Sequence, residues 1–264
     1  MKLKLIAAAA ALALSGAANA AIDVGTDGAG DFFLTMWDGS SSYTIDLNLQ
    51  QNTLNTDLAN PAGYSFSLNL ASDALFNSFI AGANLGSLSW NLTAVETQGA
   101  DTVTQTYSVL PPTGISNDNG RTMAAGVGAF AGLVNNGMTA QGSANSAVFA
   151  ANTPGYANNP LGQNPFGPNN GGLLNFNNSG SLANNSFESG LGLVSMAFLA
   201  TGTANSIYSP LSGALSPVRV YIGPDYTLHI AAVAAVPEPE TYAMLLAGLG
   251  LMGAIARRRR QQQG

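Results

Sequence analysis

The sequence has no cysteine and only one histidine, His229, among its 264 residues. Without cysteine, neither thiol catalysis nor disulfide bonds are available, so the stability of the fold must come from its core or from bound ions. A hydrolytic triad needs a base that titrates near neutral pH, and no nucleophile motif such as Gly-x-Ser-x-Gly accompanies His229. These absences argue against such chemistry, and we expect the protein not to be an enzyme.

Fixed positive charge is scarce between the two ends of the chain. Six of the eight lysines and arginines lie in the terminal segments, which leaves Arg121 and Arg219 as the only ones in residues 21–235. The same residues hold 12 of the 14 carboxylates, so their net charge is −10, against −6 for the whole chain. Such an acidic surface repels nucleic acid and anionic lipid, and we expect neither as a partner.

The first 20 residues have the pattern of a secretory signal peptide. Lys2 and Lys4 form a basic start, Leu5–Leu14 is apolar, and Ala18 and Ala20 form an Ala-x-Ala cleavage pattern. We therefore expect residues 1–20 to direct the chain through the secretion translocon and to be removed by signal peptidase after Ala20.

The C-terminal segment combines three features. Pro237, Glu238 and Pro239 precede an apolar stretch, Tyr242–Ala256, which a cluster of arginines follows. As a helix, its 15 residues would extend about 22 Å, less than the roughly 30 Å of a bilayer core. We expect a single transmembrane helix at 242–256 that anchors the chain transiently, with the C-terminus in the cytoplasm. The cluster comprises Arg257, Arg258, Arg259 and Arg260.

In the order and spacing of these features, residues 236–260 resemble the PEP-CTERM sorting signal of Gram-negative bacteria. The resemblance implies that exosortase, a membrane-embedded transpeptidase-like enzyme, recognises and cleaves the tail. It also implies that the released protein is associated with exopolysaccharide, biofilm or floc matrix. The expected location is the inner membrane first, and then the cell surface or the extracellular matrix.

Apolar and polar residues alternate repeatedly in residues 21–235, which is typical of antiparallel strands buried on one face. We predict a mainly β fold, an antiparallel β-sandwich with the jelly roll as one variant, and one or two short helices at Ser72–Ile80 and Thr122–Val134. The last two strands should pair across a Gly223-Pro224-Asp225 turn. The alternating apolar residues include Phe32, Leu34 and Met36; Ile45, Leu47 and Leu49; Tyr64, Phe66, Leu68 and Leu70; Leu88, Trp90, Leu92 and Ala94; Val218, Val220 and Ile222; and Tyr226, Leu228 and Ile230.

Residues 152–187 break this pattern because they are rich in Asn, Gly and Pro and poor in core-forming residues. Such a composition predicts a long loop or a disordered insertion. Its aromatic residues, Tyr156, Phe166, Phe176 and Phe187, could attach it to the sheet.

Two groups of residues are candidate ligand sites. Asp23, Asp27 and Asp31 recur every four residues among glycines, which suits a calcium-binding loop; the alternative is a mobile mature N-terminus. Arg219 and His229 lie opposite each other if the expected turn holds, and Arg219 would then oppose protonation of His229. That pair would suit an acidic sugar or a carboxylate; the alternative is two residues on a solvated face. No other cofactor is expected.

Three further functions stay open. Glu96 and Glu188 would suit a glycoside hydrolase if they lie about 5–10 Å apart. Exposed aromatic residues would suit a carbohydrate-binding module, although each of them suits a place in the core as well. A Thr-x-Thr-x-Thr strand would suit an ice-binding surface. The aromatic residues are Trp37, Trp90, Tyr43 and Tyr107, and the threonines are Thr102, Thr104 and Thr106.

The sorting signals and the missing catalytic residues together favour an exported structural or adhesive protein of the cell surface or extracellular matrix. The partners expected for it are exosortase, the secretion translocon, signal peptidase and exopolysaccharide.

Overall fold

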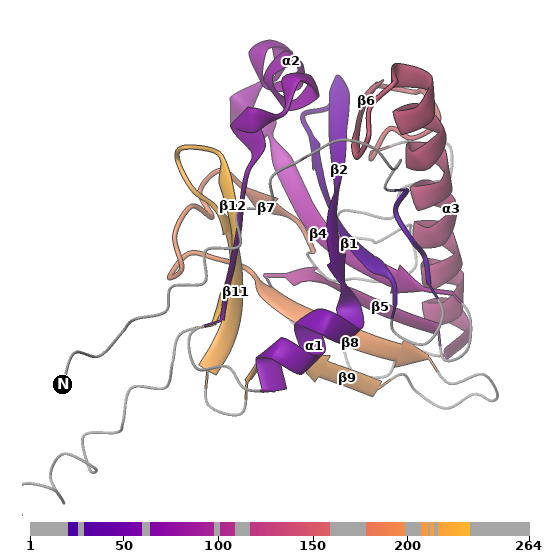
Figure 1. Ribbon diagram of the computed structural model, residues 1–264, viewed down its shortest axis with the longest axis vertical. Helices are drawn as coiled ribbons and strands as arrows, with labels where there is room; N and C mark the ends of the chain where they lie inside the picture. Colours follow the sequence, from indigo (N-terminus) through magenta and orange to yellow (C-terminus); the bar gives the residue numbers. More distant parts are fainter. Residues whose placement is uncertain are drawn as a thin grey trace, which may run out of the picture. The chain divides into compact units, whose positions relative to one another are not determined.

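Antiparallel strands form two sheets in the described part of the chain, as the alternating pattern predicts (Figure 1). The larger sheet has the strand order β6-β2-β1-β4-β5-β8-β9, with β7 paired to β4, and the smaller sheet has the order β10-β11-β12-β3. The strands are β1 (Asp31–Trp37), β2 (Ser41–Gln50), β3 (Ser65–Asn69), β4 (Ser89–Glu96), β5 (Asp101–Tyr107), β6 (Ser146–Ala150), β7 (Gly180–Ser181), β8 (Gly192–Phe198), β9 (Ile207–Pro210), β10 (Ser212–Gly213), β11 (Ser216–Ile222) and β12 (Thr227–Ala232). The helices are α1 (Gln51–Ala59), α2 (Ala74–Gly82) and α3 (Asn117–Gln141), with 3-10 turns at Leu70–Ser72 and Leu85–Ser87.

This computed structural model describes only part of the sequence. Most of the predicted loop or disordered insertion, residues 159–177, lies outside the described residues. Its two flanks, 152–158 and 178–187, are described and form turns and the short strand β7. The described residues are 21–25, 29–59, 64–97, 101–108, 117–158, 178–198, 207–210, 212–213 and 216–232.

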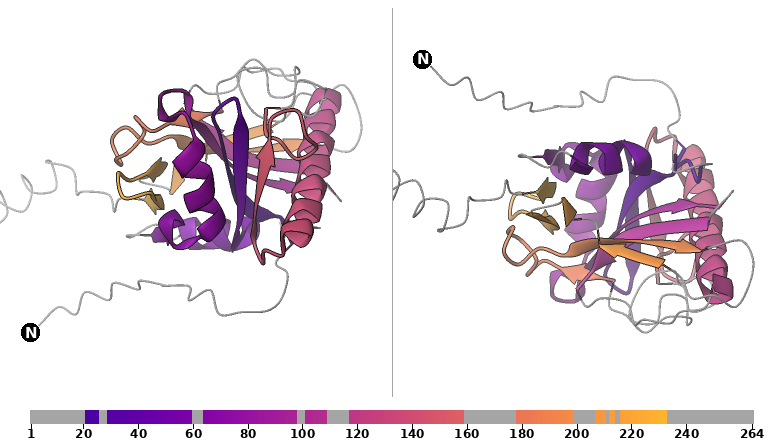
Figure 2. Two further views of the ribbon diagram at one scale, coloured as in Figure 1. Left: turned by 90° about the horizontal axis from the view of Figure 1, so that it is seen from above. Right: turned by 90° about the horizontal axis from the view of Figure 1, so that it is seen from below.

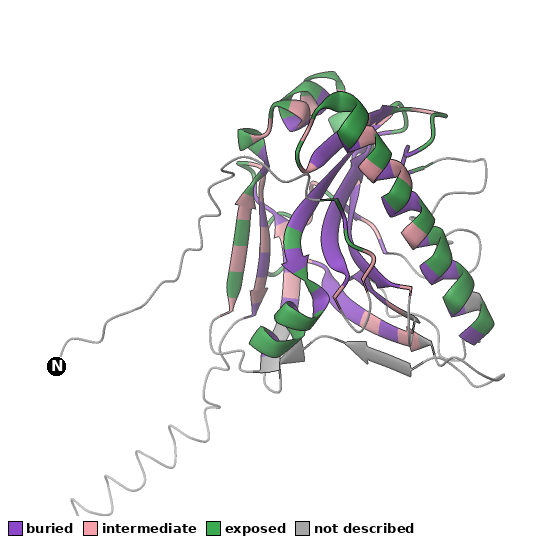
Figure 3. Cartoon of the chain, turned by 45° about the vertical axis from the view of Figure 1, so that its right-hand side comes forward, coloured by how far each residue is buried: buried purple, intermediate pink, exposed green. Residues whose placement is uncertain are grey.

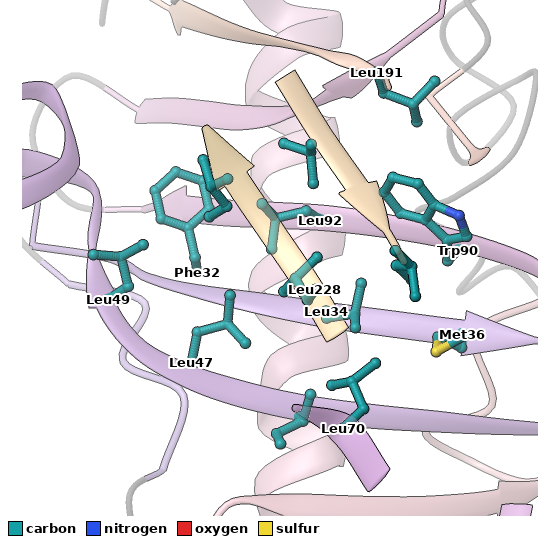
Figure 4. Packing of buried hydrophobic residues seen from close by; sticks show 14 of the residues in the cluster. Phe32, Leu34, Met36, Leu47, Leu49, Leu70, Trp90, Leu92, Leu191 and Leu228 are labelled. Atoms are coloured by element: carbon teal, nitrogen blue, oxygen red, sulfur yellow. The ribbon is translucent and has the colours of Figure 1, made fainter. Parts of the chain in front are cut away.

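An inner core lies between the two sheets. Phe32 and Leu34 of β1 belong to one cluster of buried residues with Leu92 of β4 and with Val220 and Leu228 of the smaller sheet. Figure 4 shows such side chains gathered between the strands of the two sheets. Burying each large apolar side chain stabilises the fold by about 1.5–3 kcal/mol. This shared core confirms the predicted sandwich.

A second core covers the opposite face of the larger sheet, where α3 packs across the strands (Figure 2). Phe33 and Val103 from the sheet pack with Val127, Phe130 and Val134 from the helix, and the rings of Phe33 and Phe130 lie 6.2 Å apart. Strand β1 is therefore buried on both faces. Both cores consist of residues between Ile22 and Ala232. We call residues 21–235 the body, because all the described residues of the two cores lie within it.

The helices differ from those predicted. Helix α3 has 25 residues, about twice the predicted Thr122–Val134, because its buried face contributes more than its glycines cost. Helix α1 follows β2 directly and was not predicted. Helix α2 begins at Ala74, two residues after the predicted start at Ser72. Its N-cap is Asp73, whose carboxylate accepts a hydrogen bond from the Leu75 N–H at 2.8 Å.

The glycines of α3 lie in two environments, which predicts opposite effects of alanine. A Cβ added to Gly126 or Gly132 would meet nothing within 4 Å, whereas one added to Gly137 would collide with the ring of Phe149. Gly126→Ala and Gly132→Ala should each raise the free energy of unfolding by up to about 1 kcal/mol. Gly137→Ala should lower it by about 1–3 kcal/mol. Urea unfolding followed by circular dichroism measures all three, and stabilisation by Gly137→Ala would contradict this packing.

Candidate functional site

The hairpin of β11 and β12 has a register different from the predicted one. The Gly223 N–H donates to the Thr227 carbonyl at 2.8 Å, and the Tyr226 N–H donates to the Gly223 carbonyl at 2.9 Å. The turn residues are therefore Pro224, Asp225 and Tyr226, with Tyr226 in the left-handed region at φ 59°. The predicted turn lay one residue earlier, and this shift changes every cross-strand pair.

As a result, Arg219 and His229 are not opposite each other. His229 pairs with Tyr221, and Arg219 pairs with Ala231. All four residues still lie on one face, because pairs along a strand alternate between faces. Arg219 and His229 are thus diagonal neighbours on that face. The predicted pairing is wrong, but the prediction that His229 lies on the polar face of the hairpin is correct.

This outer face of the smaller sheet is polar and accessible. Along β12, buried and half-buried residues alternate, and along β3 exposed and half-buried residues alternate (Figure 3). The buried residues point to the inner core. The outer-face residues are Arg219 and Tyr221 of β11, Thr227, His229 and Ala231 of β12, and Ser65, Ser67 and Asn69 of β3.

Tyr221 and His229 form the centre of this face. Their rings stack with centroids 4.6 Å apart and an interplanar angle of 18°. Burial lowers the pKa of His229, and the charge of Asp225 opposes this shift only in part. Arg219 is not the cause, in contrast to the sequence prediction. Sequence reasoning missed Tyr221, although its place two residues after Arg219 in an alternating strand puts both on the polar face.

The chemistry of this face suits a neutral, hydroxyl-rich ligand. Tyr221 and His229 offer aromatic surface, and the Arg219 guanidinium offers several N–H donors. Asp225, at the turn, accepts hydrogen bonds from the N–H and the hydroxyl of Thr227 at 3.2 and 2.9 Å. The hydroxyls of β3 border the stack.

The other predicted aromatic platforms are not on the surface. Trp37, Trp90 and Tyr43 are buried, so the interpretation of these three as stacking platforms is wrong. Tyr43 packs against Phe76 in the inner core, while its hydroxyl donates to the Asp73 carboxylate at 2.8 Å. Tyr107, the fourth, is half-buried against the core under α3.

The two predicted catalytic glutamates lie at opposite ends of the paired strands. Glu96 ends β4 in register with Thr102, which itself pairs with Ala197 of β8. Glu188 lies in the turn before Gly192, the first residue of β8. The residues from Gly192 to Ala197 alone span about 17 Å in an extended strand. The structure therefore does not bring the two carboxylates together.

The threonine strand faces the interior. Thr104 and Thr106 are fully buried. Thr104 accepts a hydrogen bond from the Gln51 side chain, and Thr106 donates to the Asn178 carbonyl at 2.9 Å. An exposed threonine array for ice is therefore excluded on this strand.

The N-terminal aspartates are partly ordered by backbone contacts. The Asp31 N–H donates to the Asp23 carbonyl at 2.8 Å, and the Asp31 carboxylate accepts from the Asp23 N–H at 3.1 Å. Ile22 exchanges two hydrogen bonds with the Asn135 side chain of α3, so the chain is fixed at this residue. Asp27 lies outside the described residues. Among the described residues, no group of three or more His, Cys, Asp or Glu side chains could hold a metal ion.

Asp46 is a buried carboxylate that sequence reasoning missed. It lies opposite Phe33, on the face of the larger sheet that α3 covers, and is 1% exposed. Its Oδ1 accepts from the Asn48 N–H at 2.9 Å, and its Oδ2 has no hydrogen-bond partner among the described residues. Burial raises the pKa of Asp46 to about 7, against the lowering effect of the Asn48 bond, and the negative charges of Asp31 and Asp23 raise it further.

The sorting segments lie outside the described residues, which include no helix long and apolar enough to cross a membrane. The segments that lie outside are the predicted signal peptide, residues 242–256 and the arginine cluster. The sequence itself decides the nature of the C-terminal segment, because the model of the PEP-CTERM protein-sorting motif matches residues 235–260. Residues 235–260 are a PEP-CTERM motif.

The PEP-CTERM match confirms the resemblance described above and begins one residue before the predicted 236. The motif implies export, C-terminal sorting at the membrane and exosortase as the processing partner. No curated protein and no solved structure matches the chain. The motif covers only the C-terminal segment, so the function of the body has to be argued from its own residues.

Proposed function

We propose that the body is a non-enzymatic structural or adhesive component of the cell surface or extracellular matrix, associated with exopolysaccharide and released from its membrane anchor by exosortase. The observation that carries this proposal is the PEP-CTERM motif at residues 235–260. The acidic charge of the body and the two cores described within it support it, because we expect such a domain to stay soluble and folded after its anchor is removed.

The sorting part of this proposal predicts where variants of the tail accumulate. Replacing Arg257–Arg260 by alanine should leave the chain in the inner-membrane fraction, because the positive charges hold the segment in the orientation that processing requires. Replacing Glu238 by alanine should have the same effect if exosortase recognises the Pro-Glu-Pro sequence. Fractionation with an antibody against the body measures both. Arg121→Ala is the control, and release of both tail variants at the native level would contradict the proposal.

A carbohydrate-binding role is a second candidate that the stack of Tyr221 and His229 favours. The lowered pKa of His229 leaves this ring largely neutral near pH 7, so Arg219 is the only fixed cation on the outer face. The body as a whole carries −10 and repels polyanions. A neutral polysaccharide therefore suits this face better than the acidic sugar that the sequence suggested.

We expect Tyr221→Ser to weaken binding of a neutral glucan about threefold to tenfold, because the aromatic surface is lost. Tyr221→Phe keeps the ring and should bind like the native body. Affinity electrophoresis in gels containing the glucan measures this, with a polyuronate gel as the comparison and thermal unfolding as the check on folding. If the glucan gel retains the serine variant and the native body equally, Tyr221 takes no part in binding. Stronger retention by the polyuronate would contradict the preference for neutral chains.

A further inference from the structure

Among the described residues, the smaller sheet ends at an edge strand, β3, which has a strand neighbour on one side. Strand β3 pairs with β12, and among the described strands it has no second neighbour. The Tyr64 carbonyl accepts from the Ala232 N–H at 3.0 Å, and the Leu70 N–H donates to the Tyr226 carbonyl at 3.1 Å. In an antiparallel pair the bonding direction alternates, so Ser65, Ser67 and Asn69 direct their backbone groups away from the sheet.

At the β6 edge of the larger sheet, by contrast, a side chain bonds to the outward backbone groups. The side chain of Gln141, at the end of α3, donates to the Val148 carbonyl at 2.9 Å and accepts from the Val148 N–H at 3.1 Å. These two bonds take the place of a neighbouring strand along β6. On β3, the Ser72 hydroxyl donates to the outward Asn69 carbonyl at 2.7 Å. This bond lies at the end of the strand.

Strand β3 also lacks the residues that usually prevent edge strands from pairing. Natural edges carry charged residues, proline or a bulge. No charged residue occurs between Asp57 and Asp73, and β3 contains neither proline nor a bulge in its register with β12. In a body of charge −10, this is a neutral stretch where two copies can approach each other with little repulsion.

We propose that β3 pairs antiparallel with β3 of a second copy of this chain, about a twofold axis at Ser67. Ser67 then lies opposite its own equivalent, and Ser65 lies opposite Asn69 of the other copy, so that the outward backbone groups bond each other. The same register sets Phe66 opposite Leu68 of the other copy. Both side chains are half-buried at the edge of the inner core and would become covered.

The pairing would join the two smaller sheets into one sheet with a continuous outer face. Two stacks of Tyr221 and His229, one from each copy, would then lie on that face. A surface with two such sites would hold a long polymer more strongly than a single site does. The self-association does not depend on the proposed function, because it follows from the backbone of β3.

Replacing Ser67 by residues of opposite charge, in separate variants, tests the twofold axis directly. Ser67→Lys and Ser67→Glu each place like charges opposite each other and should weaken self-association about fivefold or more, while an equimolar mixture of the two should restore it. Sedimentation of the body, which contains all the described residues of both cores, measures this over a wide concentration range. Asn52→Lys and Asn52→Glu, on the exposed side of α1, are the controls for net charge.

A native body that sediments as a monomer at every concentration would overturn the proposal. So would Ser67→Lys and Ser67→Glu variants that each associate as strongly as the native body. A second measurement does not depend on affinity. Since the chain has no cysteine, Ser67→Cys introduces a single thiol, and mild oxidation should give a disulfide-linked dimer, whereas Asn52→Cys should not. Equal crosslinking of the two variants would also contradict the proposed axis.

Discussion

Replacing Asp46 by asparagine is expected to stabilise the body at pH 8 by about 2–4 kcal/mol and to change its stability little at pH 4. In the folded state the pKa of Asp46 is about 7, whereas its ordinary value is 3.8. Between these values the folded state binds the proton more tightly than the unfolded state. The free energy of unfolding of the native body therefore falls as the pH rises from about 4 to about 7. Asparagine removes this charge while keeping an acceptor for the Asn48 N–H.

Urea unfolding at a series of pH values between 4 and 8 measures the effect. Asp57→Asn, an exposed position on α1, is the matched control for the loss of one carboxylate. The Asp46→Asn curve should be flatter than the native one, and the two should meet at low pH. A native body whose stability does not fall over this range, or an Asp46→Asn variant with the native slope, would contradict the burial of a charged Asp46.

Replacing Trp90 by alanine is expected to lower the free energy of unfolding by about 3–5 kcal/mol. The indole is fully buried, and its Nε1–H donates to the Ser181 carbonyl at 2.9 Å, which attaches β7 to β4. Gly180 packs so closely on this ring that a Cβ there would collide with it. The substitution therefore removes core volume and one of the hydrogen bonds that hold β7 to β4. Tyr221→Ser, in contrast, should cost no more than about 1 kcal/mol, because its ring lies on the outer face.

Chemical unfolding and glucan binding of the two variants separate the roles of these aromatic residues. Trp90→Ala should lose stability, and any binding that remains should be that of its folded fraction. Tyr221→Ser should keep its stability and lose binding. A stable Trp90→Ala body that fails to bind would restore the interpretation of Trp90 as a stacking platform.

The inner faces of the strands were predictable because one signal, alternation with period two, reflects one physical cause. Phe32, Leu34 and Met36 face the smaller sheet, and Val218 and Val220 face back toward them. The polar residues between them were expected on a solvated face. That expectation fails for Asp46 and Asn91, which are buried. Alternation distinguishes two faces and does not reveal that a second layer covers the polar one.

Several of the buried polar residues of the larger sheet bond to Asn178. The Asn178 side chain donates to Gln105 at 3.0 Å, while the Asn178 carbonyl accepts from Thr106 and Asn91. These bonds join residues far apart in sequence, so no local pattern predicts them. They also fix the chain directly after residues 159–177. The glycines of α3 concealed the full length of this helix, because their low helix propensity is outweighed by packing.

The candidate site was only partly predictable for a similar reason. A shift of one residue in a hairpin turn changes which side chains are opposite each other. Here the third turn residue, Tyr226, adopts a left-handed conformation that is uncommon for residues other than glycine, so the sequence favoured the earlier Gly-Pro-Asp turn. His229 was found on the correct face, but its partner is Tyr221 and not Arg219.

The intact mass of the exported protein tests the central claim most directly. If the PEP-CTERM motif directs processing, the mature protein begins at Ala21 and ends before Arg257. Its mass then corresponds to the acidic body with at most a short remnant of the tail. An exported protein that still carries Arg257–Arg260 would contradict the account of how this chain reaches its place of action.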